Sequence, residues 1–301
     1  MNNYNYFIKK HDLKVEKLTK TKNTTIIKTP LGQFVFKKGN INIYNYLLSR
    51  GFNYFPKIVD YNDNLIMFKY IENIEYDKEQ KAEDYIKLIS LLHSKTCYYK
   101  QVDIDNYKDL YEKLYSKLDD INNYYSNLIN IIETKEYMSP CEYLIARNIT
   151  NIFLLINNSY RLLEDWYKII KNNDKKRVVT LYNSIDINNM IKGTKGIYLT
   201  SFNNTSVDIP IYDLYNFYNK YYLDFDFRNI IKRYEELFPL IEDEVILLMI
   251  MISIPEKVII NNTVNNIIDI KIFINKIFRT IDFLNSKKEE DTSAHQEKND
   301  K

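Results

Sequence analysis

Cysteine, histidine and glycine are scarce in this sequence, and the scarcity excludes several kinds of site. Cys97 and Cys141 are the only cysteines, so the chain offers neither a disulfide framework nor a cysteine-based zinc site. The three histidines share no spacing typical of metal ligands. Hydrophobic residues make up 45% of the 301 residues, which is enough for the buried core of one large domain or two lobes.

The net charge is also small, and the apolar runs are short. The 42 basic residues nearly cancel the 40 acidic ones, and the net charge of +2 is too small to drive non-specific binding to nucleic acid or anionic lipid. The longest apolar run, Val245–Ile252, is far shorter than the ~20 residues that cross a bilayer. Residues 1–10 contain no apolar segment typical of a secretory signal. We therefore expect no nucleic-acid partner, no membrane span and a cytoplasmic location.

Tyrosine, in contrast, is abundant, with 28 residues. Tyr, Asn, Ile and Lys share A/T-rich codons, so an A/T-rich genome is the simplest explanation of the excess. The alternative is a surface built for oxidative cross-linking or for stacking on a ligand. Because tyrosines occupy helical core spacings along much of the chain, we favour the genomic explanation.

The first seventy residues are predicted to form mainly strands. Residues 24–29 and 33–37 are rich in β-formers, and Pro30-Leu31-Gly32 between them predicts a hairpin turn. A helix is expected at residues 40–50, where Gly51 ends it. Two further strands are expected at residues 57–60 and 65–70.

From Tyr76 onward the pattern is almost entirely helical. Apolar residues recur at spacings of four and three from Tyr107 to Ile132, which predicts one long helix. Ser139-Pro140-Cys141-Glu142 is a capping box with proline in the first turn, and it predicts the start of a second long helix. We therefore expect a helical hairpin at about residues 105–172.

Two short strands and four helices complete the prediction. The strands are expected at 177–181 and 197–200, and the helices at 212–220, 227–238, 242–252 and 264–284. The predicted organisation is an α+β fold with a β-rich lobe at residues 1–72, a helical lobe at 73–285 and a disordered tail at 286–301.

Residues 177–220 resemble the catalytic region of aminoglycoside- and choline-phosphotransferase-like proteins, and more closely the spore-coat kinase-like proteins of endospore-forming bacteria. Gly51–Pro56, Leu91–Thr96 and Leu237–Glu244 extend this resemblance over about residues 10–285. It implies a protein-kinase-like fold with a small β-rich N-lobe and a large, mostly helical C-lobe. The helical hairpin is then an insertion, and residues 177–213 are a degenerate catalytic region.

The resemblance aligns the family loop His-Gly-Asp-x-x-x-x-Asn with residues 182–189. Ser184 then occupies the position of the catalytic aspartate, and a serine hydroxyl does not replace a carboxylate as a base. Asn189 matches the metal-binding asparagine of the family. Asp186, two residues beyond Ser184, replaces the missing carboxylate only if the loop is remodelled.

The other expected parts of a phosphotransferase site are also altered. The metal-binding aspartate of the family falls on Asn203, whose amide oxygen is a poorer Mg²⁺ ligand. Lys37 best matches the lysine that contacts the nucleotide phosphates, but residues 39–59 contain no acidic partner for it. No glycine occurs in residues 18–25, where the phosphate loop belongs. Asp213 matches the aspartate that holds the catalytic-loop backbone.

Two functions follow from these observations. In the favoured one, the protein is a pseudokinase that acts as a spore-coat or sporulation-associated scaffold, with protein partners and no expected cofactor. The alternative is an atypical phosphotransferase that moves the ATP γ-phosphate to a small hydroxylated molecule. It would use Lys37, Asp186, Asn189 and Asn203 with ATP and Mg²⁺. Nucleotide binding without transfer is an intermediate case.

Overall fold

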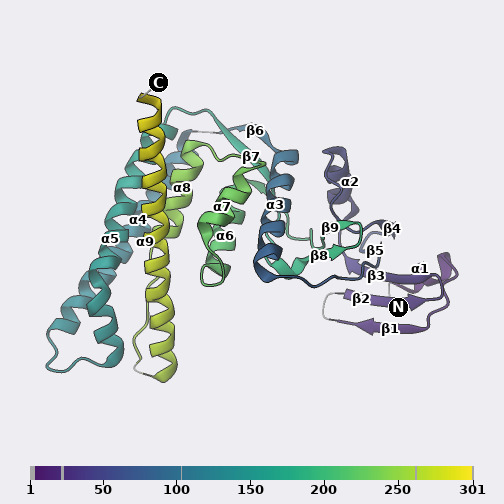
Figure 1. The fold of residues 1–301 in the computed structure, drawn as a ribbon, viewed down its shortest axis with the longest axis horizontal. Helices are drawn as coiled ribbons and strands as arrows, with labels where there is room; N and C mark the ends of the chain where they lie inside the picture. Colours follow the sequence, from purple (N-terminus) through teal and green to yellow (C-terminus); the bar gives the residue numbers. More distant parts are fainter. Residues whose placement is uncertain (1–3, 22–23, 103, 262, 300–301) are drawn as a thin grey trace. The chain divides into compact units, whose positions relative to one another are not determined.

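The computed structural model describes residues 4–21, 24–102, 104–261 and 263–299, with residues 104 and 288–299 described by their backbone alone (Figure 1). Two compact units account for the chain. The first comprises Met1–Tyr98, Val178–Asp213 and Lys232–Pro239, and the second Tyr99–Arg177, Leu214–Ile231 and Leu240–Lys301. This division differs from the predicted lobe boundary after residue 72, because residues 178–213 group with the β-rich part of the chain.

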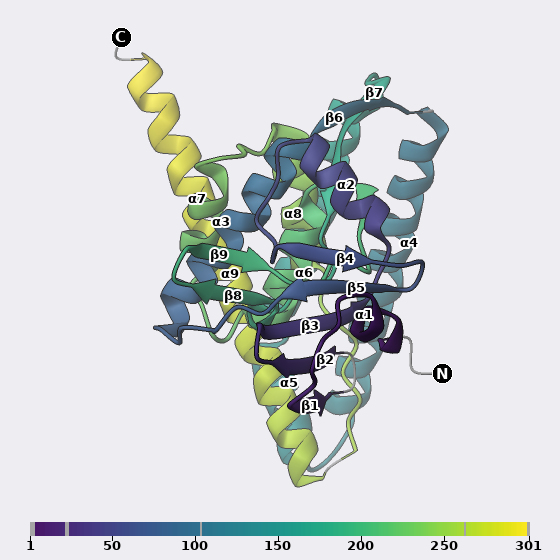
Figure 2. The ribbon, with the colours of Figure 1, turned by 90° about the vertical axis from the view of Figure 1, so that its right-hand side faces the viewer.

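A five-stranded antiparallel sheet forms the centre of the first unit. Its order is β1-β2-β3-β5-β4, and Figure 2 shows these strands side by side. The strands are β1 (Lys17–Lys20), β2 (Thr24–Thr29), β3 (Gly32–Lys38), β4 (Ile58–Tyr61) and β5 (Leu65–Lys69). The predicted β2–β3 hairpin is confirmed, with Thr29 paired to Gly32. Gly32 has φ of +119°, which an L side chain rarely adopts, so glycine suits this turn.

The two faces of the sheet carry different side chains, because successive residues of a strand point to opposite sides. On one face, Phe36 and Met67 form a buried cluster with Phe7 of α1 (Asn5–Lys10). On the other face, Val35 and Lys37 of β3 line a cavity. Strand β3 therefore stabilises the unit with one set of residues and presents Lys37 with the other.

Two helices of the first unit begin with side-chain caps. Asn40 caps α2 (Ile41–Ser49), and Asp77 caps α3 (Lys78–Thr96) by accepting from two backbone amides. Tyr44 of α2 packs against Phe68 and Phe202, with both ring centroids at 5.5 Å. This aromatic packing holds the segment around residue 202 against the sheet and α2.

The rest of the first unit contains the predicted loop region. Strand β7 (Lys175–Leu181) enters from the second unit and is followed by the short 3₁₀ helix η1 (Ile187–Asn189). An antiparallel hairpin follows, formed by β8 (Met190–Gly193) and β9 (Gly196–Leu199). Strand β10 (Ser206–Asp208) then pairs with the end of β7.

In the second unit the predicted helical hairpin is confirmed as α4 (Ile104–Glu133) and α5 (Pro140–Ile170). Ser139 and Glu142 form the capping box at the start of α5. The remaining helices are α6 (Ile211–Tyr221), α7 (Phe227–Glu235), α8 (Glu242–Ser253) and α9 (Val264–Asn299). Helix α6 begins in the first unit, and α7 ends there.

Several short elements did not emerge from the sequence pattern. They are α1, β1, β8, β10 and β6 (Tyr98–Gln101), each of six residues or fewer. Segments this short complete few periods, which leaves only a weak helical or strand pattern.

Helix α9 also differs from the prediction at its end. It continues to Asn299, through most of the predicted disordered tail at residues 286–301, of which 300–301 lie outside the described residues. Residues 286–299 contain neither proline nor glycine and are rich in Glu and Lys, which favour helix. No helix in the described part of the chain combines the length and apolarity that a bilayer crossing requires.

Candidate functional site

A cavity of about 240 Å³ lies beside the sheet of the first unit. Its apolar wall includes Ile26, Val35 and Phe68, which are cross-strand neighbours on β2, β3 and β5. The other lining residues are Thr24, Lys37, Pro56, Lys69, Tyr70, Ile71, Asn188, Asn189, Ile191 and Thr200. Two lysines and no acidic residue occur among these described lining residues, so the cavity favours anionic or neutral ligands over cations.

Lys37 donates a hydrogen bond from Nζ to the backbone carbonyl of Thr200, at 3.0 Å. Burial lowers the pKa of the Lys37 ammonium, because a low-dielectric environment disfavours the charged form. Helix α2, where the family would place a carboxylate for this lysine, carries no acidic residue. Lys37 therefore contacts a neutral carbonyl from the segment that follows β9.

Asn203 makes a second link between this segment and β3. Its Nδ2 donates to the backbone carbonyl of Lys38 at 2.8 Å. A Cβ atom added to Gly39 would lie 3.0 Å from Asn203 Oδ1, so the close approach of the amide favours glycine there. An aspartate at 203 has no N–H to donate, so the observed contact depends on the amide.

The loop at residues 182–189 turns tightly after β7. Asn183 has a φ of +55°, and the amide of Ser184 donates to the carbonyl of Tyr182 at 2.7 Å. Asn189 Nδ2 donates to the carbonyl of Ser184 at 2.8 Å. Asp186 caps η1, because its carboxylate accepts from the amide of Asn188 at 2.8 Å. Hydrogen bonds among the loop's own residues therefore hold its backbone.

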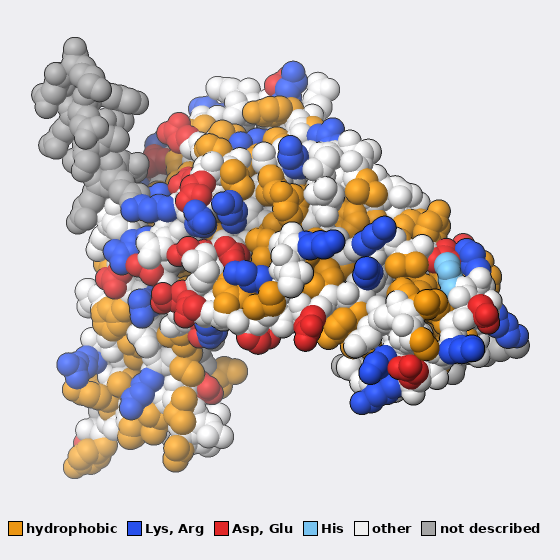
Figure 3. Space-filling model, turned by 45° about the vertical axis from the view of Figure 1, so that its right-hand side comes forward, with side chains coloured by type: hydrophobic (Ala, Val, Ile, Leu, Met, Phe, Trp, Pro, Cys, Tyr) orange, Lys and Arg blue, Asp and Glu red, His pale blue; other side chains and the backbone are white. Residues whose placement is uncertain are grey.

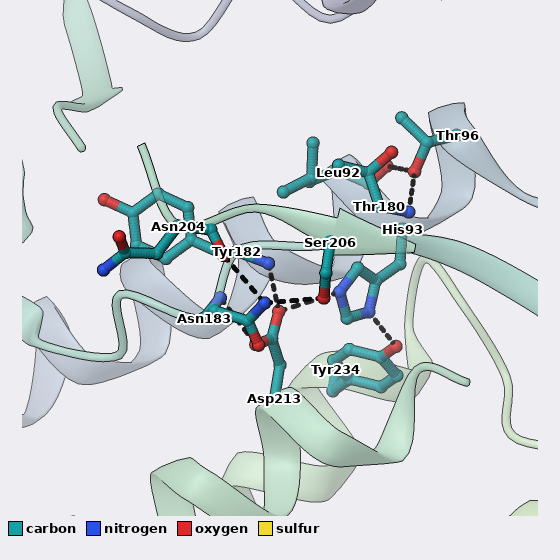
Figure 4. A network of polar contacts seen from close by, with 10 residues as sticks. All are labelled: Leu92, His93, Thr96, Thr180, Tyr182, Asn183, Asn204, Ser206, Asp213 and Tyr234. Atoms are coloured by element: carbon teal, nitrogen blue, oxygen red, sulfur yellow. Dashed lines mark hydrogen bonds and ion pairs between the residues drawn. The ribbon is translucent and has the colours of Figure 1, made fainter. Parts of the chain in front are cut away.

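The carboxylate of Asp213 holds the backbone of the same loop (Figure 4). It accepts from the backbone amides of Tyr182 at 2.7 Å and Asn183 at 3.0 Å. His93 Nε2 lies 3.1 Å from the carboxylate, and His93 Nδ1 lies 2.6 Å from the hydroxyl of Tyr234. All of the Asp213 and His93 side-chain surface is buried. Because an ionised carboxylate only accepts, His93 Nε2 donates to it.

The structure brings most of the sequence-predicted site residues into one region of the first unit. Lys37 and Asn189 line the cavity, and Ser184 is bonded to Asn189 through its backbone carbonyl. Asn203 contacts β3 at Lys38 and is not among the lining residues. Asp186, which caps η1, is not among them either.

Sequence reasoning missed several polar groups of this region. The carbonyl of Thr200, which accepts from Lys37, and the hydroxyl of Tyr234, which contacts His93, had no local signal. His93 itself lies on the buried side of α3, where both of its ring nitrogens make hydrogen bonds.

A magnesium ion does not fit the residues at the expected metal positions. Both Asn189 and Asn203 present neutral amides, and the Asn203 amide donates to a carbonyl. Mg²⁺ favours carboxylate oxygens. Within the described residues, no group of three or more His, Cys, Asp or Glu side chains is placed to hold a metal ion. We therefore derive no metal-dependent step from this site.

A scan against family models and a search of curated proteins found no match. A search of solved structures found an aminoglycoside phosphotransferase from Alicyclobacillus acidocaldarius, with a TM-score of 0.64, 8% identity and coverage of 92% of each chain. The chain has the kinase-like fold of the aminoglycoside phosphotransferases. The predicted α+β, protein-kinase-like fold class is therefore confirmed.

Other solved structures match with lower TM-scores. Choline kinase LicA from Streptococcus pneumoniae has a TM-score of 0.47 and 15% identity, with coverage of 91% of this chain and 99% of that one. A spectinomycin phosphotransferase in complex with ADP and spectinomycin has a TM-score of 0.45 and 13% identity, with coverage of 89% and 94%. At such identities the similarity concerns the fold and carries no activity over.

Replacing Asp213 tests its role in holding the loop. In Asp213→Asn an N–H₂ group faces the backbone amides or His93, so at least one buried donor loses its acceptor. We expect the free energy of unfolding to fall by about 2–3 kcal/mol, measured by urea denaturation. Asp186→Asn is the matched control from the same loop, because its retained oxygen still accepts from Asn188. An equal loss in both variants would contradict the role of Asp213.

Lys37→Met tests the burial of the ammonium group through its pH dependence. The pKa of Lys37 is lowered from 10.5, so the unfolded chain binds more protons at this lysine between the lowered pKa and 10.5. Stability contributed by Lys37 therefore rises with pH through this window. We expect the difference in melting temperature, wild type minus Lys37→Met, to increase from pH 7 to pH 10. Lys38→Met, at an exposed neighbour, controls for charge loss, and an equal increase in that variant would contradict the prediction.

Proposed function

We propose that this protein is a catalytically degenerate kinase-fold protein, a pseudokinase that acts through contacts with other proteins. The proposal rests on the hydrogen bonds that Lys37 and Asn203 make. Both side chains donate to backbone carbonyls, of Thr200 and Lys38 respectively. In the family these positions serve the nucleotide phosphates and the metal ion. Here they join β3 to residues 200–203.

The loop chemistry supports the same proposal. Ser184 stands where the catalytic base of the family stands, and a hydroxyl is a far weaker base than a carboxylate. Asp186, the nearest carboxylate in the loop, caps η1 and is not a lining residue of the cavity. The backbone of the loop is nevertheless held by Asp213. The scaffold of the family is kept, while its acid–base and metal chemistry is absent from the expected positions.

The biological setting that we propose rests on the resemblance to spore-coat kinase-like proteins. In this proposal the protein is made in the cytoplasm of an endospore-forming bacterium and serves as a spore-coat or sporulation-associated scaffold. Its partners are spore-coat or mother-cell proteins, and it needs no cofactor.

An atypical phosphotransferase is the second candidate. The cavity beside Lys37 and Asn189 favours it, because these two groups flank the space that a nucleotide would need. Under this alternative Lys37 would contact ATP, Asn189 and Asn203 would hold Mg²⁺, and Asp186 would replace the catalytic carboxylate. The acceptor would be a small hydroxylated molecule. Nucleotide binding without transfer lies between the two candidates.

A transfer assay separates these candidates. The full chain is incubated with γ-labelled ATP and Mg²⁺ or Mn²⁺ and with a set of amino-alcohol and aminoglycoside acceptors, and thermal shift is recorded with ATP in Mg²⁺ or EDTA. We expect no labelled product and no thermal shift that requires the metal, because the described residues that line the cavity include no carboxylate. Metal-dependent transfer that is lost in Lys37→Met and Asp186→Ala would overturn the pseudokinase proposal. A shift of equal size in EDTA would identify nucleotide binding without transfer.

Asn203→Asp tests whether the metal position has become a structural contact. The aspartate has no N–H for the Lys38 carbonyl, and its charge faces that oxygen. We expect the free energy of unfolding to fall by about 1–2 kcal/mol in urea denaturation, with or without Mg²⁺. Asn204→Asp is the matched control, because Asn204 is exposed and adjacent. Stabilisation of Asn203→Asp by Mg²⁺ and ATP together would favour the phosphotransferase instead.

A further inference from the structure

Hydrophobic side chains, a class that includes tyrosine in Figure 3, reach the surface of the protein at many places. One group of four tyrosines lies on the hairpin of the second unit, where α4 and α5 pack against each other. We call it the tyrosine cluster, and its members are Tyr111 and Tyr115 of α4 and Tyr160 and Tyr167 of α5. Tyr115 is exposed, and the other three are partly buried. The cluster is therefore within reach of dissolved reagents.

The rings of Tyr111 and Tyr167 form the central pair of this cluster. Their centroids are 4.5 Å apart and their planes differ by 34°, so one face lies against the other with a moderate tilt. Tyr115 extends the group, with its ring centroid 6.1 Å from that of Tyr111 and 5.4 Å from that of Tyr160. The central pair links the start of α4 to the end of α5, at the end of the hairpin opposite its turn.

Other tyrosine pairs of the chain differ from the central pair in geometry or access. The rings of Tyr124 and Tyr125 are 5.2 Å apart but nearly perpendicular, at 83°, and both hydroxyls donate to backbone carbonyls. Tyr85 and Tyr182 are buried, with centroids 6.2 Å apart. The central pair combines a shorter separation, more nearly parallel rings and partial exposure. It is therefore better placed than these pairs for a reaction between two rings.

The surroundings of Tyr111 keep its hydroxyl protonated. Burial raises the pKa of this phenol, and the negative charge of Glu164 on α5 raises it further. At neutral pH the group is therefore a phenol, and its oxidation releases a proton together with an electron. The carboxylate of Glu164, whose charge acts on this hydroxyl, is a base that receives such a proton.

We propose that the central pair is a site of oxidative cross-linking, at which Tyr111 and Tyr167 become joined by a carbon–carbon bond. The oxidant is hydrogen peroxide acting through a peroxidase. Each phenol gives up one electron and one proton, and the two phenoxyl radicals join at ring carbons next to their oxygens. The hydrogen on each joined carbon then moves to the oxygen as a proton, which restores both aromatic rings. The peroxide takes up the two electrons and two protons and becomes two molecules of water.

The new bond connects two helices that no disulfide connects, since Cys97 and Cys141 are both free. It closes a loop that contains most of the hairpin, and a cross-link of this kind lowers the conformational entropy of the unfolded chain. The oxidised protein therefore resists unfolding more than the unmodified one. The inference rests on the arrangement of this pair, whatever the reason for the large number of tyrosines, and it does not depend on catalysis.

Oxidation of the full chain by a haem peroxidase and hydrogen peroxide tests the proposal. A low micromolar protein concentration favours reaction within one molecule. After digestion with trypsin, Tyr111 lies in the peptide Asp109–Lys113 and Tyr167 in Leu162–Lys168, each with a single tyrosine. We expect a product whose mass equals that of the two peptides less two hydrogen atoms. The monomer band of a denaturing gel should carry the fluorescence of dityrosine.

Tyr111→Phe and Tyr167→Phe each remove one phenol and keep the ring, so both should lose the cross-linked peptide and most of the fluorescence of the monomer. Tyr137→Phe is the matched control, because Tyr137 is 83% exposed and lies in the hairpin turn, outside the cluster. This variant should keep both signals. Oxidation should raise the urea midpoint of the wild type and of Tyr137→Phe, and of neither cluster variant.

The wild type alone decides the test if a variant fails to fold, which circular dichroism would reveal. The proposal is overturned by a wild type in which the exposed Tyr137 is oxidised while no product joins the two peptides. Fluorescence of the monomer that persists unchanged in both folded cluster variants also overturns it. A principal product that joins other tyrosines has the same consequence.

Discussion

The buried carboxylate of Asp213 holds the loop of the candidate site by its backbone. It accepts hydrogen bonds from the amides of Tyr182 and Asn183, and His93 contributes a third. A buried charge that loses such partners costs several kcal/mol, so the arrangement is strongly specified. Through His93 and Tyr234 it also connects the loop to α3 and to α7 within the first unit. This anchor fixes the backbone where the loop begins, at residues 182 and 183.

Because the anchor acts on backbone amides, it leaves the loop side chains free to change. Ser184 replaces the carboxylate that the family resemblance leads one to expect, yet the turn around it is intact. The contact of Asn203 with the carbonyl of Lys38 likewise depends on its side chain, since an amide donates and a carboxylate does not. The shape of the turn therefore does not require a carboxylate at residue 184. The same reasoning explains why a kinase-like fold does not by itself establish a kinase.

The two units present different kinds of surface. The first contains a cavity with two lysines and an apolar wall, which suits a small anionic or neutral molecule. The second exposes apolar side chains, among them Tyr137, Ile259 and Val264. A protein that works through contacts needs the second kind of surface, and a phosphotransferase needs the first.

The sequence alone determined the features that depend on neighbouring residues. The β2–β3 hairpin followed from its β-rich runs and turn, and the start of α5 followed from its capping box at Ser139. The resemblance led to the kinase-like fold. The tertiary structure alone decided which distant groups meet: Lys37 and Thr200 are 163 residues apart, and His93 and Tyr234 are 141 apart. Local propensity acts over a few residues. The partner of a buried polar group, in contrast, depends on which segments the whole chain packs together.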